Sequence, residues 1–293
     1  MASNLQSLLK CVAVALALSG CARIEEAKLV RRPADAPDVF VLVVSGHCLP
    51  IMGLCDGNFN PEYMSHAGTP DALATALTDA DHDVRTGAYV DGWYTWVDTE
   101  DVVLAAGFLD LVATLQLVND AWMRGFSNPT RLVLVGHGHG VVWTHLAAYA
   151  APSVPIEVLV DLDGHSSGWD DDEGYFGVGD DWPAFIPGYV EADEQTWTID
   201  AWIAADSWSV SGVPDSQDIE DVVAPTAVLN LEVQSTPDVF QQEYEVFDGD
   251  ANHRPDGGTK GIRTFTSTGD HYSVYEPGSD SMNWVIEEIL GSL

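Results

Sequence analysis

The feature that most constrains the fold of this chain is a series of short, continuous apolar runs rich in valine, leucine and isoleucine. They span residues 39–45, 131–135, 156–162 and 226–233, and residues 261–266 are expected to form a final strand. Runs without polar alternation are typical of strands that are buried on both faces of a parallel sheet. With 46% apolar residues, the 293-residue chain can bury one large core. We therefore predict one sheet that contains these strands.

Helical patterns separate the predicted strands. They occupy residues 70–77, 104–123, 141–150 and 281–290, and a further short strand is expected to end near Val90. Within residues 104–123 the apolar side chains recur at helical spacing, which predicts one long amphipathic helix. Strands that alternate with helices predict an α/β fold with a doubly wound, mostly parallel sheet.

A tight glycine-rich turn joins the strand at 131–135 to the helix at 141–150. It consists of Gly136, His137, Gly138, His139 and Gly140. Strand, turn and helix in this order resemble the nucleophile elbow, G-x-S-x-G, of the α/β-hydrolase superfamily of lipases and esterases. The elbow needs its outer glycines because side chains there would clash with neighbouring backbone. The resemblance implies an α/β-hydrolase-type sheet with an inserted cap.

The central position of this turn is Gly138, where the family carries its serine. Glycine has no oxygen that can attack an acyl carbon, so the nucleophile position is vacant and we expect serine-ester catalysis to be lost. Whether the chain is an enzyme at all stays open. The alternative is a carboxylic-ester hydrolase that uses an atypical nucleophile or a water activated by a histidine.

The resemblance implies roles for residues outside the turn. His271, in the sequence Gly-Asp-His-Tyr after the last predicted strand, matches the family's base, and Asp238 matches the acid that orients it. Gly46 and His47 match the loop that contributes one oxyanion-hole amide, and His139 would contribute the second. No cofactor is expected.

The first residues read as an export signal. Lys10 is followed by a short apolar stretch and by Leu-Ser-Gly-Cys, which ends at Cys21 and resembles the bacterial lipobox. The resemblance implies removal of a signal peptide, residues 1–20, and lipid attachment to Cys21. Residues 21–38 then form a tether. We expect an outer-membrane lipoprotein that faces the periplasm or the exterior, with the membrane as partner through its anchor.

Two further cysteines, Cys48 and Cys55, lie in the loop after the first predicted strand. Export to a compartment that permits disulfides favours a bridge between them.

Composition changes sharply between residues 165 and 222. Five of the ten tryptophans lie there among many carboxylates, and no lysine or arginine occurs from Leu132 through His253. We interpret this segment as an acidic cap inserted into a core made of residues 39–164 and 223–293. The formal charge of −35 excludes nucleic acid as a partner, which leaves an unknown small-molecule or protein ligand.

Oxygen-bearing side chains at alternate positions suggest part of a calcium loop. They are Asp248, Asp250, Asn252 and Asp256. The glycine and the glutamate that complete an EF-hand loop are absent, so an acidic surface turn is the better interpretation. No spacing supports a transition-metal site.

Overall fold

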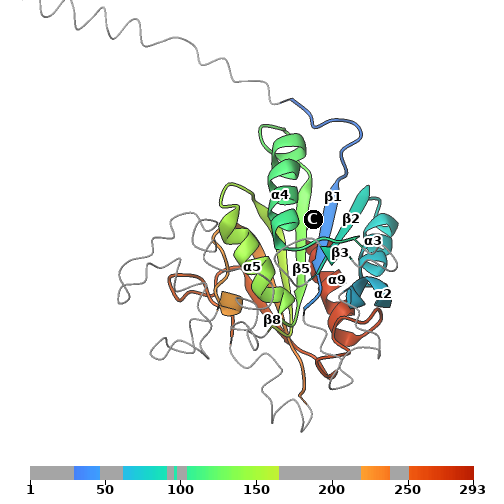
Figure 1. Ribbon diagram of the computed structural model, residues 1–293, viewed down its shortest axis with the longest axis vertical. Coiled ribbons are helices and arrows are strands. Elements are labelled where there is room, and N and C mark those ends of the chain that lie inside the picture. The colour runs from blue at the N-terminus through green and yellow to red at the C-terminus, as the bar shows by residue number, and fades with distance from the viewer. Residues whose placement is uncertain (1–29, 47–61, 91–95, 98–103, 165–218, 238–250) are drawn as a thin grey trace, which may run out of the picture.

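The computed structural model describes residues 30–46, 62–90, 96–97, 104–164, 219–237 and 251–293 (Figure 1). Its centre is a six-stranded sheet in the order β2-β1-β5-β6-β7-β8, in which every neighbouring pair is parallel. The strands are β1 (Val39–Val44), β2 (Val84–Tyr89), β5 (Arg131–His137), β6 (Ile156–Leu162), β7 (Ala227–Gln234) and β8 (Ile262–Thr266). The predicted fold class, an α/β fold with a doubly wound, mostly parallel sheet, is confirmed.

Helices cover both faces of this sheet. On one face α4 (Phe108–Val118) and α5 (Gly140–Ala150) pack against the even-numbered side chains of β1, such as Leu42. On the other face α3 (Thr69–Asp79) and α9 (Asp280–Ser292) pack against the odd-numbered ones, such as Val41. Because successive strand residues point to opposite faces, a continuous apolar run serves both layers. The short helix α2 (Tyr63–Ala67) precedes α3.

The long helix predicted for residues 104–123 begins later than expected, although the helical stretch ends at Met123 as predicted. Leu104–Ala105 forms strand β4, which pairs with β3 (Trp96–Val97) in a small antiparallel sheet. The Val90 amide donates to the carbonyl of Ala106, which keeps this stretch extended beside the end of β2. The helix begins at Phe108, and after Val118 it widens into a π-helical turn, η2 (Asn119–Met123).

Parts of the predicted tether and cap pack on the core. Val30 forms a bridge with Phe126, and the backbone amide of Arg32 donates to the Asn128 side chain. At the end of the predicted cap, the short helix η5 (Ile219–Asp221) is buried beside α5. Within the ranges that the structure describes, no helix is long and apolar enough to cross a membrane.

Candidate functional site

The glycine-rich turn lies between the end of β5 and the start of α5, as a sharp bend. Gly138 has a φ of +55°, in the left-handed region, and its amide donates to the carbonyl of Leu162 at 3.0 Å. Val141 donates to the Gly138 carbonyl at 3.0 Å, which closes the bend at the head of α5. This geometry presents residue 138 at the carboxyl edge of the sheet, where loops of parallel α/β proteins form their sites.

The glycines around the bend permit close backbone approach. A Cβ atom at Gly140 would lie 2.3 Å from the carbonyl oxygen of Val44, and one at Gly136 would lie 2.7 Å from the Cα of Val141. A Cβ at Gly46 would lie 2.6 Å from the His137 carbonyl oxygen. The loop after β1 is therefore pressed against the bend, and any side chain at these positions would separate the two.

A histidine and a carboxylate meet beside the bend. The Nδ1 of His271 lies 2.6 Å from the Oδ2 of Asp163, and the two residues are 5% and 0% exposed. The other carboxylate oxygen of Asp163 accepts the Ser235 amide at 2.7 Å. A carboxylate oxygen accepts, so Nδ1 of this imidazole is placed to donate to Asp163, which is the orientation in which a histidine acts as a general base through Nε2.

The acid in this pair comes from a different strand than the sequence predicted. Asp163 follows β6 directly and has a φ of +52°, an uncommon conformation for a residue with a side chain. The predicted acid, Asp238, lies outside the described residues and stays a prediction. Both residues directly follow strands of the predicted parallel sheet, which places them at the same edge, but nothing in the sequence indicated that they pair across 108 residues.

Tyr63 of α2 connects the loop after β1 to the bend. The Gly46 amide donates to its hydroxyl oxygen at 2.8 Å, and the hydroxyl donates to the Nδ1 of His137. The Nε2 of His137 in turn donates to the carbonyl oxygen of His271 at 2.8 Å. Burial, reinforced by the nearby His271, holds the pKa of His137 well below its ordinary value. His137 is therefore a neutral connector between the bend and the loop of the base.

The structure describes two of the three residues predicted for the oxyanion hole. The Gly46 amide donates to the Tyr63 hydroxyl oxygen, so this amide already has a partner within the protein. His139 lies buried at the N-terminus of α5, as the residue that follows the vacant position. His47 lies outside the described residues, as do Cys21, Cys48 and Cys55.

The described half of the calcium candidate does not converge. Asn252 is buried and donates its side-chain amide to Asp161 at 2.7 Å, whereas Asp256 accepts the Gly258 amide in an exposed turn. Asp248 and Asp250 lie outside the described residues. Among the residues that are described, no group of three or more histidines, cysteines or carboxylates could hold a metal.

A second histidine-aspartate pair lies inside the molecule. The Nε2 of His145, on α5, is 3.0 Å from the Oδ2 of Asp161, on β6, and both side chains are at most 1% exposed. The amides of Asn230 and Asn252 donate to the same oxygen. Nothing in the sequence singled out this pair, because histidine on a helix is common.

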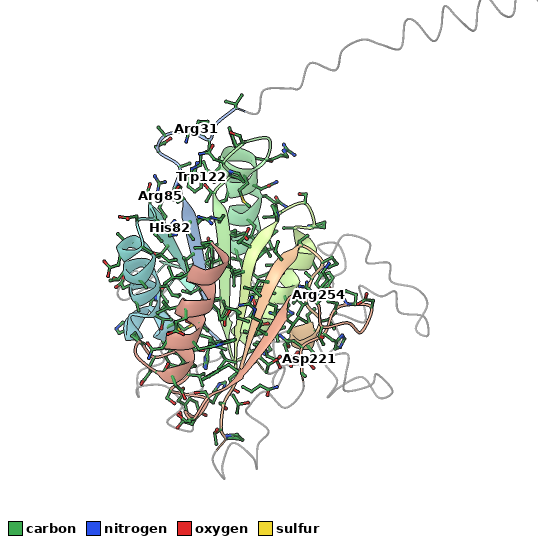
Figure 2. All side chains as sticks on the ribbon, turned by 180° about the vertical axis from the view of Figure 1, so that it is seen from behind. Arg31, His82, Arg85, Trp122, Asp221 and Arg254 are labelled. Atoms are coloured by element: carbon green, nitrogen blue, oxygen red, sulfur yellow. The ribbon has the colours of Figure 1, made fainter. Side chains whose placement is uncertain are left out.

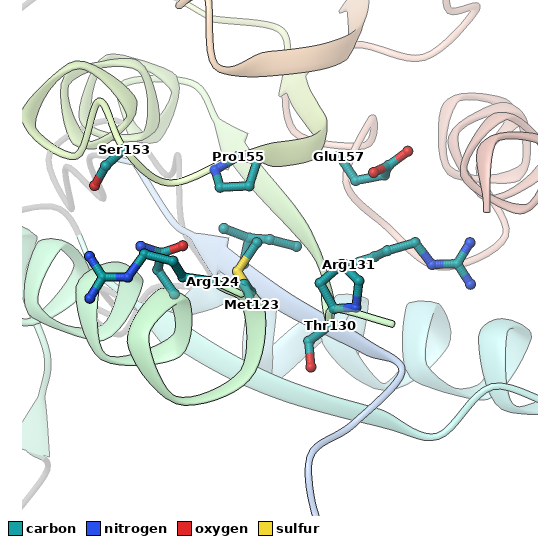
Figure 3. Close-up of a pocket in the computed structure, with 10 residues that line it drawn as sticks. Met123, Arg124, Thr130, Arg131, Ser153, Pro155 and Glu157 are labelled. Carbon is teal, nitrogen blue, oxygen red and sulfur yellow. The ribbon is translucent and has the colours of Figure 1, made fainter. Parts of the chain in front are cut away.

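A pocket of about 340 Å³ opens at the opposite edge of the sheet, where the strands begin (Figure 3). Its walls include Met123, Arg124, Arg131 and Glu157. It lies far from the bend, since β5 begins at Arg131 and ends at His137.

Comparisons with known proteins found similarity only to solved structures. No family model matches the chain, and no curated protein matches its sequence. Among solved structures, one of two esterases from the fungus Rhizomucor miehei has a TM-score of 0.41 at 14% identity, with 89% of this chain and 76% of that chain covered. An esterase of the archaeon Pyrobaculum calidifontis has a TM-score of 0.39 at 16% identity, with 89% and 78% covered.

A further structure, Est1E from Butyrivibrio proteoclasticus with bound ferulic acid, has a TM-score of 0.40 at 14% identity, and 89% of this chain and 90% of that chain are covered. At such scores and identities, the activities of these proteins carry no argument about this chain. Its function has to be argued from its own residues.

Proposed function

We propose that this protein is a lipid-anchored binding protein with an α/β-hydrolase-type core, which binds a small molecule or a protein and has lost serine-ester catalysis. One observation carries the proposal. Gly138 occupies the left-handed bend at the head of α5 and has no hydroxyl. A base and its orienting acid cannot form an acyl-enzyme without an atom that attacks.

Two of the described hydroxyls beside the bend, those of Tyr63 and Ser45, are engaged with neighbouring groups. The Tyr63 hydroxyl donates to His137, and the Ser45 hydroxyl oxygen accepts the Met64 amide at 3.3 Å while the residue is 1% exposed. Both are held by the structure around them. In serine hydrolases the loss of the nucleophile leaves about 10³- to 10⁴-fold acceleration over water from binding and the oxyanion hole.

The decisive experiment restores the hydroxyl. A soluble chain that lacks residues 1–21 should hydrolyse no short nitrophenyl ester and should not label with a fluorophosphonate. Gly138→Ser is expected to label and to gain esterase activity, because the new hydroxyl stands at the bend near the base. Gly138→Ala is the matched control, since it adds the same Cβ strain without an oxygen. Robust fluorophosphonate labelling of the unaltered chain would contradict the proposal.

Binding is tested separately from catalysis. The tryptophan fluorescence of the same protein is titrated with short acyl esters, glycans and peptides, and saturation with at least one class is expected. A flat response to the whole panel would remove the binding role while leaving the loss of catalysis intact.

The anchor has its own test. Mass spectrometry of the N-terminal peptide from the membrane fraction should show a lipid-modified Cys21, and Cys21→Ala should abolish the modification. An unmodified Cys21 in the membrane fraction would refute the anchor. Fractionation of the outer membrane then tests the proposed location.

A second candidate function is ester hydrolysis by a water that His271 activates. The observation that favours it is the intact pair with Asp163 at 2.6 Å, which orients the imidazole as a base. Under this alternative, the chain hydrolyses esters without fluorophosphonate labelling. His271→Ala should then abolish the activity and Asp163→Asn should lower it strongly, whereas an unchanged rate in His271→Ala would exclude this route.

A further inference from the structure

The pocket at the edge where the strands begin, which we call the strand-start pocket, is lined by two stretches of the chain. They lie within residues 119–132 and residues 153–157. Figure 3 shows Ser153 and Glu157 at opposite ends of one side, and Met123 on the side that faces them. The volume of about 340 Å³ lies within the range of small-molecule sites. At about 30 Å³ for each water-sized group, it admits about ten non-hydrogen atoms.

The wall that carries Met123 is the π-helical turn η2. The Arg124 amide donates to the Asn119 carbonyl at 2.8 Å, which closes this wider turn. Trp122 anchors the turn to β2, because its ring centre lies 5.1 Å from the Arg85 guanidinium, and Figure 2 shows these two residues side by side. Residues four apart on a helix share a face, so Asn119 and Met123 both line the pocket. Such turns are frequent at functional sites.

The side chain of Asn119 is a buried polar group that the described protein leaves unused. The residue is 4% exposed and lines the pocket. Among the residues that the structure describes, none forms a hydrogen bond with its side-chain carboxamide. Folded proteins pair the large majority of buried side-chain amides, because an amide without a partner has given up its hydrogen bonds to water. A molecule in the pocket would supply the partner.

Glu157 is the charged residue of the pocket walls whose charge is not matched within the described ranges. Its partly buried carboxylate forms no hydrogen bond or ion pair with a residue in those ranges. In contrast, Arg124 pairs with Asp120 at 3.0 Å, and Arg131 donates to the carbonyl oxygen of Leu293. Figure 3 shows both guanidinium groups pointing away from the centre of the pocket. A carboxylate without a partner favours an ammonium ion, and the formal charge of −35 attracts cations from solution.

The remaining lining is apolar. Met123 is 6% exposed and Leu132 is fully buried, and Pro129 and Pro155 complete this part of the walls. The sulfur of methionine makes favourable contacts with aromatic rings. An aromatic body therefore fits between the polar groups of the pocket.

We propose that the strand-start pocket binds a small primary amine that has an aromatic body and a second polar group. The ammonium pairs with Glu157, the ring lies against Met123, and the second polar group bonds to the carboxamide of Asn119. The pocket lies at the opposite edge of the sheet from Gly138, so this site goes beyond the function proposed for the bend.

The test titrates the full chain, solubilised in a mild detergent, with tyramine, which has an ammonium group, an aromatic ring and a hydroxyl. The methionine methyl groups carry a carbon-13 label, and physiological ionic strength screens diffuse attraction to the acidic surface. The Met123 methyl signal is expected to shift and to saturate with a Kd of about 1 mM or lower. Met64 and Met282 are buried against the other face of the sheet, so their signals should not move. A Met123 signal that stays still or never saturates would overturn the proposal.

Two analogues of tyramine test the chemistry of the ligand. Para-hydroxyphenylacetate carries a carboxylate in place of the ammonium group and should not bind, because Glu157 repels it. Phenethylamine lacks the hydroxyl and should bind about fivefold more weakly, because it offers no partner to Asn119. Equal binding of the carboxylate would reject the proposal and assign the pocket to anions.

Variants test the two polar residues. Glu157→Gln should weaken tyramine binding about tenfold. Glu287→Gln is the matched control, since it removes the same charge from an exposed residue of α9 that does not line the pocket. Asn119→Ala should weaken tyramine about fivefold and leave phenethylamine unchanged. Unmoved signals of Met64 and Met282 show that each variant is folded. An unaltered tyramine affinity in Glu157→Gln would reject the site.

The outcome is separate from that of the proposed function. Tyramine binding in the strand-start pocket needs neither the bend nor a lipid on Cys21. Its failure would remove this pocket alone, and the Gly138 variants would still report on catalysis at the opposite edge.

Discussion

The two histidine-aspartate pairs of this protein differ in where their partners come from. His145–Asp161 is built from a helix and a strand and lies inside the core, with its shared carboxylate oxygen also bound by Asn230. His271–Asp163 is built from two loops at the carboxyl edge, beside the vacant bend. A short histidine-carboxylate contact is therefore not by itself a functional site. The His271–Asp163 pair is a candidate for acid-base chemistry because it lies beside the bend.

The largest expected effect comes from breaking the His145–Asp161 pair, which we call the inner pair; the His271–Asp163 pair is the outer pair. His145→Gln should lower the free energy of unfolding by about 3–5 kcal/mol, because it leaves a buried carboxylate without its charged partner. Asp161 already has one carboxylate oxygen without a hydrogen-bond partner. His271→Gln should cost only about 1–2 kcal/mol, since the Ser235 amide still binds Asp163. Urea unfolding measures both, and equal losses would mean that the two pairs do not differ.

The inner pair should also give stability a pH dependence. Burial lowers the pKa of His145, but the neighbouring Asp161 and its hydrogen bond outweigh burial, so the pKa is raised. A raised pKa in the folded state stabilises the protein below the ordinary histidine value of about 6.5, and this contribution is lost as the pH rises through the folded pKa. Urea midpoints from pH 6 upward should therefore fall. The fall should be absent in His145→Gln, and a fall of the same size there would assign it to another group.

A smaller effect is expected at Tyr63, which connects the loop after β1 to His137. Tyr63→Phe removes the hydroxyl that joins Gly46 to His137, at a cost of about 1 kcal/mol. Nitrogen-15 spectra should show His137 protonated at Nε2 in the parent protein and a changed signal for His271 in the variant. The spectrum of His145 should not change, and a change there would show that the two pairs are coupled.

The smallest effect concerns the loop that carries His271. Burial raises the pKa of Asp280, but hydrogen bonds from Ser267, Thr268 and Ser281 outweigh it and lower the pKa to about 2. A lowered folded pKa stabilises the protein above the ordinary value near 4, and this contribution is lost as the pH falls toward 2. The protection factors of residues 267–272 against hydrogen exchange, taken relative to the intrinsic rate at each pH, should therefore fall between pH 4 and 2. Asp280→Asn should exchange fast already at pH 4, and an unchanged loop in this variant would refute the role.

The sequence predicted the six strands of the main sheet, their alternation with helices and the bend, because each rests on local physics. Continuous apolar runs have to be buried on both faces, and the glycines at 136 and 140 permit backbone contacts that no side chain allows. The absence of a hydroxyl at Gly138 is likewise a fact of the sequence.

The contacts between distant side chains are visible only in the folded structure. Asp163 reaches His271 across 108 residues, and Tyr63 reaches His137 across 74. The helix expected from residue 104 onward begins at Phe108, because the carbonyl of Ala106 is bound by the distant Val90 amide. Such contacts join segments whose spacing along the chain carries no periodic signal, so they exist only once the sheet has brought the segments together.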